Sequence, residues 1–529
     1  MKVVIFAILF LAVLSRCDRF DENLIIQPLL DGKLASEFRF ITTAQNKDHF
    51  VVFPRTLAHV MEKFNVREMH LSLTQGRWRY DKWGEPLSPT PVGAELIALF
   101  HNSHNITDQW KGLVHALSGL LCASLNFLDT TTQSTYASGV VSGLSSDPNF
   151  RYGTLSHETV CTENLTPFKK LLPSRAKCGL GTLLSSIKMY DSQFHSIGVH
   201  FESSERGYEL MQTITVVSDL LYGRTNRVFT DFELSRVFDQ HQPILKCPFA
   251  VNTSVLIDTS RLEVEGVNPF ADKQIGFVKP NNIAETSGRH EHLINLVPGT
   301  PLSLKFQFNE KVNIPSEYPA QIPIIATRHE SNTPITAELS LNVENTLDTQ
   351  IVVHYYDAIP WYFRMYWHTL TVVGGKVKYI NRRTARERQR PAELEMAVLL
   401  GPRENFTVSF NFDKVFLKYT EHSPDANRGF DLSSSVLYYT FNTSDNATTI
   451  PLHFPPHRDI NRIYTDSLLV SLPTPDFSMP YNVITLSSTI LALFFGSMFN
   501  ALVRRFNEEL LPKQGLLARI FQKLKSKKS

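Results

Sequence analysis

Two long apolar runs stand at opposite ends of the chain and predict its topology. Val3 to Leu14 follows Lys2 without a break, as in a secretory signal peptide, and a cut after Cys17 leaves a mature chain beginning at Asp18. An uncleaved anchor helix is the alternative, although this run is short for crossing a bilayer. Val483 to Val503 has neither charge nor proline, and as a helix it reaches roughly 31 Å, enough to span a membrane.

The first part of the chain between these runs mixes strand and helix patterns. Phe38 to Thr43 is typical of a strand, and Arg55 to Asn65 of a short helix after Pro54. A longer helix is predicted to begin at Thr107 or Asp108, either of which can cap it. Its apolar residues recur at helical spacing, which predicts a face buried in a core, at Trp110, Leu113, Val114, Leu117, Leu120 and Leu121.

From about residue 250 the pattern changes to alternation with a period of two. Apolar residues alternate with polar ones or lysine in two segments, at Leu302, Leu304, Phe306 and Phe308 and at Phe406, Val408, Phe410 and Phe412. Further strands are predicted at 335–343, 350–356, 365–373, 394–400, 436–441 and 467–472, and a long loop at 310–334. Short alternating strands separated by turns indicate an antiparallel β-sandwich.

These patterns predict an α+β protein that is rich in strand and has a single C-terminal transmembrane helix. Roughly 465 residues lie between the two apolar runs, more than one hydrophobic core usually organises. We therefore expect a signal peptide at 1–17, a mixed α/β membrane-distal luminal domain at 18–250 and a β-sandwich luminal domain at 251–482. A transmembrane helix at 483–503 and a basic cytosolic tail at 504–529 follow.

The charge distribution favours the same orientation. Residues 504–529 carry eight Lys or Arg against two Glu, and a tail of +6 within a total of +2 leaves −4 for everything before it. The positive flank predicts a cytosolic C-terminus, and the mildly acidic body carries no nucleic-acid footprint. Lys525 and Lys527 resemble a dilysine retrieval signal for endoplasmic reticulum membrane proteins.

Six glycosylation sequons precede the span and none follows it, as expected for a luminal body. Asn164 is the weakest acceptor because Pro167 follows its Thr166. The candidate glycosylation sites are Asn105, Asn164, Asn252, Asn405, Asn442 and Asn446.

The mature chain retains four cysteines, at Cys122, Cys161, Cys178 and Cys247. They can pair in an oxidising lumen, but they are too few for a disulfide scaffold, and no CxxC motif is present.

Motifs for chemistry are weak. The chain has no Gly-rich phosphate loop, no GxSxG elbow and no HExxH. His157 and Cys161 have the spacing of one helix face and could form a thiolate pair, but a structural role for Cys161 is favoured. His290 and His292 lack a clear third ligand. We therefore expect no catalytic residue, no metal site and no cofactor.

Several longer strings resemble the PIG-T family, a subunit of glycosylphosphatidylinositol (GPI) transamidase. Together they extend from about residue 70 to the membrane span. They are Thr74-Gln-Gly-Arg-Trp-Arg79, His115-Ala-Leu-Ser-Gly-Leu-Leu-Cys-Ala-Ser-Leu-Asn126, Cys161-Thr-Glu-Asn-Leu-Thr-Pro-Phe-Lys-Lys-Leu-Leu-Pro173, Ile359-Pro-Trp-Tyr362 and Leu472-Pro-Thr-Pro-Asp-Phe-Ser-Met-Pro-Tyr-Asn482.

The resemblance implies a non-catalytic scaffold subunit in the endoplasmic reticulum. The complex replaces the C-terminal signal of a proprotein with a GPI lipid, and its nucleophilic cysteine belongs to PIG-K, a caspase-related subunit. The expected partners are that subunit and the other membrane subunits, with the proprotein and the GPI lipid as substrates of the complex. A luminal cysteine hydrolase and a cell-surface adhesion or receptor ectodomain are the alternatives; a GPI-anchored precursor does not fit, because a basic tail follows the apolar run.

The resemblance also implies that Cys161 forms an interchain disulfide with the catalytic subunit. By counting, one internal pair remains, for which we expect Cys178 and Cys247, and a buried free thiol at Cys122 inside the apolar helix. An internal pair between Cys161 and Cys178 is the alternative. The family often has a cysteine where this chain has Ser174, and we expect Cys178 to replace it.

The span is also predicted to pack against another helix. Small or polar residues recur every four positions along one stripe and allow close approach, at Ser488, Ala492, Gly496 and Asn500.

Overall fold

The computed structural model describes most of the chain in two compact units. One unit comprises residues 1–416 and 425–473, and the other residues 417–424 and 474–529. The described residues are 18–29, 31–47, 50–101, 105–128, 133–134, 149–158, 160–205, 207–219, 228–239, 244–258, 275–278, 284–287, 291–299, 305–313, 322–332, 336–422, 428–441, 462–474 and 478–504, with Gly515, Ile520 and Lys523.

The larger sheet of the first unit has eleven strands in the order β12-β13-β10-β1-β2-β8-β7-β3-β4-β6-β5. Neighbouring strands are antiparallel except β1 and β10, which run parallel. The strands are β1 (Arg19–Pro28), β2 (Lys33–Ala44), β3 (Val66–Gln75), β4 (Gly93–Phe100), β5 (Gln133–Ser134), β6 (Phe150–Leu155), β7 (Phe194–Ser203), β8 (Tyr208–Asp219), β10 (Asn252–Asp258), β12 (Ala284–Ser287) and β13 (Glu291–Asn295).

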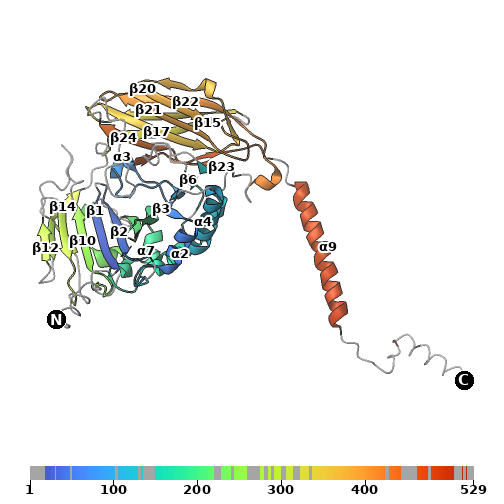
Figure 1. The fold of residues 1–529 in the computed structure, drawn as a ribbon, viewed down its shortest axis with the longest axis horizontal. Coiled ribbons are helices and arrows are strands. Elements are labelled where there is room, and N and C mark those ends of the chain that lie inside the picture. The colour runs from blue at the N-terminus through green and yellow to red at the C-terminus, as the bar shows by residue number, and fades with distance from the viewer. Residues whose placement is uncertain are drawn as a thin grey trace. The chain divides into compact units, whose positions relative to one another are not determined.

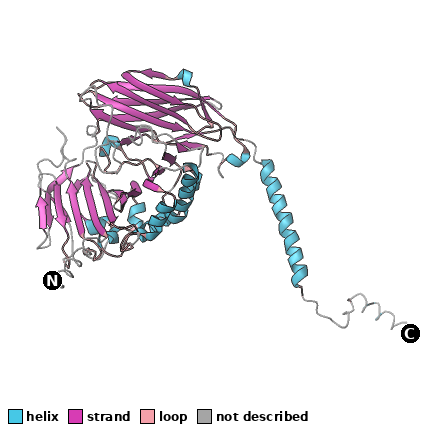
Figure 2. Ribbon diagram, in the orientation of Figure 1, coloured by secondary structure: helices cyan, strands magenta, loops and turns pink. Residues whose placement is uncertain are grey.

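Helices cover one face of this sheet (Figure 2). They are α2 (Arg55–Lys63), α4 (Ile106–Leu121), α6 (Thr162–Leu171) and α7 (Ser186–Tyr190). The short α8 (Leu234–Val237) packs on the same core, and the short α3 (Tyr80–Trp83) contributes to a separate cluster. Phe38, Leu71, Trp110 and Phe168 are fully buried in one continuous core between the strands and the helices. The apolar stripe therefore builds this core, as its spacing predicted.

The predicted helices are confirmed, with small shifts at their ends. The short helix follows Pro54 and ends at Lys63. The longer helix, α4, begins at Ile106 with Asn105 as its N-cap, rather than at Thr107 or Asp108. Five of its six apolar stripe residues are buried, and Leu120 is partly buried against the same core.

The predicted antiparallel sandwich is present in the same unit (Figure 1). One sheet has the order β15-β16-β22-β18 with β19 also on β22, and the other β20-β21-β17-β24-β25. Its strands are β15 (Ile324–Asn332), β16 (Thr336–Asn345), β17 (Ile351–Ile359), β18 (Phe363–Met365), β19 (Thr371–Val373), β20 (Lys376–Arg383), β21 (Ala392–Leu400), β22 (Asn405–Lys414), β24 (Val436–Phe441) and β25 (Arg462–Tyr464).

Alternation along β22 buries Phe406, Val408, Phe410 and Phe412 between the two sheets, as predicted. A buried ion pair also joins the sheets, because Arg328 on β15 lies 2.6 Å from Asp357 on β17. Two smaller sheets complete the unit: β11 (Ile275–Val278), β14 (Lys305–Asn313) and β9 (Val228–Glu233); and β23 (Phe430–Leu432) with β26 (Leu468–Val470).

Three details differ from the sequence prediction. The segment predicted as a loop at 310–334 contains all of β15 and the end of β14. The strand predicted at 365–373 is broken by a 3-10 turn at Trp367–Thr369, so it becomes β18 and β19. The eleven-stranded sheet extends past residue 250, because β10 pairs with β1 over residues 252–257 and brings β13 with it.

The larger sheet and the sandwich share an aromatic core within the first unit. Ile97 and Phe150 from the larger sheet pack with Tyr356 and Tyr438 from the sandwich. The Tyr464 hydroxyl donates to the Glu95 carboxylate at 3.1 Å across this contact. Burial at this junction fixes one sheet against the other.

The second unit contains α9 (Ser478–Val503). Residues 481–503 of this helix are long and apolar enough to cross a membrane. The helix carries Ser488, Ala492, Gly496 and Asn500 on its exposed surface, and their role in packing stays a prediction. Lys525 and Lys527 lie outside the described residues.

Candidate functional site

Cys161 caps the N-terminus of α6 and has a tightly held main chain. Its N–H donates to Oδ1 of Asn164 at 2.8 Å. Its carbonyl accepts from the Asn164 and Leu165 amides at 3.1 and 3.4 Å, and from the Tyr190 hydroxyl at 2.5 Å. The thiol is half-buried and unpaired by any disulfide in this chain. The arrangement fixes the position of Cys161 and leaves its sulfur accessible at the end of a helix.

Asn164 connects this cysteine to the end of α4. Its side chain is 2 % exposed, and Nδ2 donates to the carbonyls of Leu121 and Cys122 at 3.1 and 2.9 Å. Together with the Oδ1 contact to Cys161, these bonds use both polar atoms of the amide. Asn164 therefore joins the C-terminus of α4 to the N-terminus of α6.

This geometry argues against a glycan at Asn164, and the absence of one becomes a prediction. A glycan is attached through Nδ2, which here is buried and already donates to two carbonyls. The sequence offers a hint, because an Asn three residues after a helix N-cap can return a hydrogen bond to the cap. Because Asn164 also begins a sequon, its sequence context predicted a glycan acceptor rather than a capping residue.

The other candidate acceptors are placed differently. Asn105, Asn252 and Asn405 are exposed, so their use stays a prediction. Asn442 and Asn446 lie outside the described residues.

The expectation of a buried thiol at Cys122 is wrong. The residue ends α4 in the left-handed conformation, with φ 52°, and its side chain is exposed. Leu121 is the last inward-facing residue of the helix. The chain turns immediately afterwards, so the apolar stripe does not include the cysteine.

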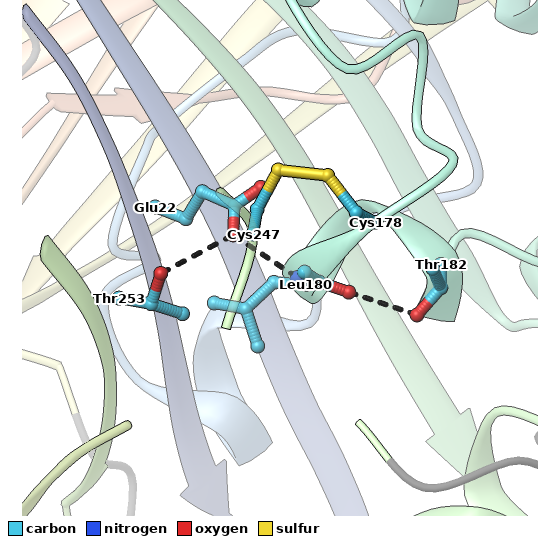
Figure 3. The surroundings of a disulfide bond; sticks show 7 residues. Glu22, Cys178, Leu180, Thr182, Cys247 and Thr253 are labelled. Carbon is cyan, nitrogen blue, oxygen red and sulfur yellow. Dashed lines mark hydrogen bonds between the residues drawn. A yellow bond between two sulfur atoms is a disulfide. The ribbon is translucent and has the colours of Figure 1, made fainter. Parts of the chain in front are cut away.

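Cys178 and Cys247 form the expected internal disulfide, which pins the 3-10 turn at Gly179–Leu183 to the segment before β10 (Figure 3). Glu22 of β1 lies beside it, with Oε2 accepting from the Leu180 amide at 3.2 Å and from Thr253 at 3.4 Å. A Cβ at position 179 would lie 2.0 Å from that oxygen, and φ there is +65°, so the close approach requires glycine.

Glu22 has no exposed surface, and Oε1 has no hydrogen-bond partner. Burial raises the pKa of Glu22 to about 7, against the opposing effects of the Leu180 and Thr253 hydrogen bonds. The carboxyl group therefore titrates close to neutrality inside the core. Sequence patterns gave no sign of it.

The proposed thiolate pair is not assembled. His157 lies in a turn rather than on a helix with Cys161, and its side chain is 68 % exposed. Its Nδ1 lies 3.7 Å from the Asp431 carboxylate. A general base must instead contact the nucleophile that it activates. Among the described residues no group of three metal-ligating side chains is gathered, and His290 lies outside them.

The chain matches a family model over nearly its whole length. That model is described as the Gpi16 subunit, a GPI transamidase component, and it matches residues 4–247 and 222–527. The chain belongs to the Gpi16 family. The human "GPI-anchor transamidase component PIGT" is 36 % identical over 95 % of this chain and 93 % of that protein.

Fungal relatives have lower identity but similar coverage. The "GPI transamidase component GPI16" of Saccharomyces cerevisiae is 28 % identical over 92 % of this chain and 88 % of that protein. The "GPI transamidase component PIG-T homolog" of Schizosaccharomyces pombe is 29 % identical over 96 % of this chain and 94 % of that protein. The resemblance inferred from the strings is thereby confirmed, and the Gpi16 relatives are named as components of one transamidase.

Proposed function

We propose that this chain is a non-catalytic scaffold subunit of GPI transamidase and holds the caspase-related catalytic subunit through a disulfide from Cys161. The carrying observation is a free, half-exposed thiol on a main chain fixed by four hydrogen bonds. The resemblance to the PIG-T family also implies a bond from this position to the catalytic subunit. A cysteine held in this way presents its sulfur in one place, which favours pairing with a docked partner.

The covalent bond suits a scaffold that stays attached throughout turnover. Once two chains are linked, the partner no longer pays the translational cost of association at each encounter, so a modest surrounding interface is enough. The remaining parts of the proposal are residence in the endoplasmic reticulum, one membrane crossing by α9 and a luminal position for the first unit. The signal-like N-terminus and the basic tail support them.

Cys161→Ser is expected to abolish the disulfide-linked heterodimer on a non-reducing gel while transamidase activity falls but persists, because noncovalent contacts remain. Cys122→Ser is the matched control, since it removes the other free thiol among the described residues, which is also the more exposed of the two. It should leave the heterodimer intact. If the heterodimer survives Cys161→Ser and disappears with Cys122→Ser, the interchain bond comes from Cys122, and its assignment to Cys161 is wrong.

The same variants test the hydrolase alternative. A nucleophilic Cys161 predicts that the complex assembles fully with Cys161→Ser but loses all turnover. The scaffold proposal predicts lost covalent assembly with residual turnover, so one gel and one activity assay separate the two.

A further inference from the structure

The outer edge of the sandwich is formed by β20, which pairs with one strand only, β21, among the described residues (Figure 1). The opposite margin of the same sheet, β24 and β25, is covered by contact with the larger sheet. An edge strand directs alternate backbone N–H and C=O groups outward, where another extended chain can pair with them. The β20 edge is therefore the open end of this sheet.

Strong positive charge is concentrated on this edge. Residues 376–390, which comprise β20 and the turn after it, contain seven Lys or Arg and one Glu, a charge of +6 for this segment, although everything before the tail sums to −4. Two of these arginines are already ion-paired, Arg383 with Glu393 of β21 and Arg388 with Glu387. The basic residues are Lys376, Lys378, Arg382, Arg383, Arg386, Arg388 and Arg390. Lys376, Lys378, Arg382 and Arg386 are exposed. Such a local reversal of sign favours an acidic partner.

Apolar side chains are exposed along the same edge. Val377, Tyr379 and Ile380 of β20 are 38 %, 41 % and 39 % exposed. Val373 is 69 % exposed on β19, which precedes β20 in the chain and pairs with β22 of the other sheet. A charge or a bulge alone is enough to keep strands of other molecules away from an edge. Exposed apolar residues between the charges add a surface that an approaching chain can bury. Protection of the edge against pairing therefore explains the charges on β20 but not its exposed apolar residues.

We propose that β20 is a docking strand for an extended acidic polypeptide segment, which adds to the sheet edge and places carboxylates against the Lys and Arg side chains. Backbone pairing supplies the register and the charges supply the selectivity. A segment of alternating acidic and apolar residues matches Lys376, Val377 and Lys378 at the start of β20, because successive side chains of a strand point to opposite faces. The pairing register of β20 with β21 shifts after these residues, between Val377 and Tyr379. The docking surface is independent of Cys161 and adds a second contact to the proposed scaffold role.

The test measures binding of the full-length chain, in detergent, to a fluorescent ten-residue peptide that alternates Glu and Val. Binding is expected, with a loss of at least about tenfold when Lys376, Lys378 and Arg386 are all changed to Glu, because three attractive pairs become repulsive. Lys63→Glu with Lys111→Glu is the matched control. Both residues are exposed on α2 and α4, and the double change should leave affinity within about twofold.

Two further probes distinguish strand addition from simple charge attraction. A peptide of the same sequence, N-methylated at alternate residues, keeps its charges but cannot pair along one edge, and it should bind at least about tenfold more weakly. Equal binding of both peptides overturns the proposal. The proposal is also overturned if the Glu-Val peptide does not bind while the chain, transferred from detergent to amphipol, binds phosphatidylserine vesicles. That result would make the edge a lipid-binding surface.

Discussion

Replacing Glu22 by Gln is expected to stabilise the protein at pH 8 and to have little effect at pH 4.5. Burial raises the pKa of the folded-state carboxyl from 4.5 to about 7. Between these values the folded chain holds a proton that the unfolded chain has lost, so stability falls as pH rises through this window. Above about 7 both states are ionised and the penalty is complete, roughly 3 kcal/mol for one fully buried carboxylate.

The Gln variant has no ionisable group at position 22. The free energy of unfolding of wild type, minus that of the variant, should therefore fall by about 1–3 kcal/mol between pH 4.5 and pH 8. Thermal unfolding of the oxidised full chain across this range measures it. Glu62→Gln is the control, since Glu62 is exposed on α2, and it should leave the difference within about 0.5 kcal/mol. A Gln variant that is less stable than wild type at pH 8 would mean that the Leu180 and Thr253 hydrogen bonds outweigh the cost of burial.

The sandwich could be predicted because its strands each have one buried face. Along β22 the buried phenylalanines alternate with partly or fully exposed polar residues, so the period of two is visible in the sequence. The helix α4 was predictable for the same reason at a helical period. When only one face of an element is buried, the spacing of its apolar residues shows whether it is a strand or a helix.

The larger sheet was mostly missed because both of its faces are covered. All eight residues of β4 are buried, so its sequence Gly-Ala-Glu-Leu-Ile-Ala-Leu-Phe shows no alternation. The parallel pairing of β1 with β10 joins residues 231 apart, and no local pattern indicates it. Tertiary contacts, rather than local pattern, place these strands.

The candidate site was predictable only at its cysteines. The family-like string pointed to Cys161, and counting the remaining thiols left one internal pair, which was expected at Cys178 and Cys247 and is found there. Glu22 and Asn164 were not found, because their importance depends on burial. The sequence indicates surface positions for a carboxyl between polar neighbours and for an Asn in a sequon, and only the fold shows that both are enclosed.

Replacing Asn164 by Ala is expected to destabilise the first unit by about 2–4 kcal/mol. The change leaves the carbonyls of Leu121 and Cys122 and the amide of Cys161 without their side-chain partner. Each polar group that loses its partner in a buried site costs about 1–3 kcal/mol, and water can reach Cys122 and reduce the sum. Thermal or denaturant unfolding gives the size of the loss.

Asn164→Ala should also reduce the yield of the Cys161-linked heterodimer, because the Cys161 N–H then lacks the side-chain oxygen that accepts its hydrogen bond. Asn164→Asp separates the two contributions. One oxygen can still accept from Cys161, as Oδ1 does in wild type, whereas the other faces two carbonyls and repels them. It should therefore lose stability and retain more of the heterodimer than Asn164→Ala does.

Thr166→Ala removes the same sequon without touching the amide, and so serves as the matched control. Thr166 is exposed and donates only to the Thr162 carbonyl within α6, so its loss should cost less than about 0.5 kcal/mol. Because Nδ2 is buried, neither variant should gain mobility on a reducing gel through loss of a glycan. Faster migration of both, with stability and the heterodimer unchanged, would show that Asn164 carries sugar and that the bridge between α4 and α6 does not form.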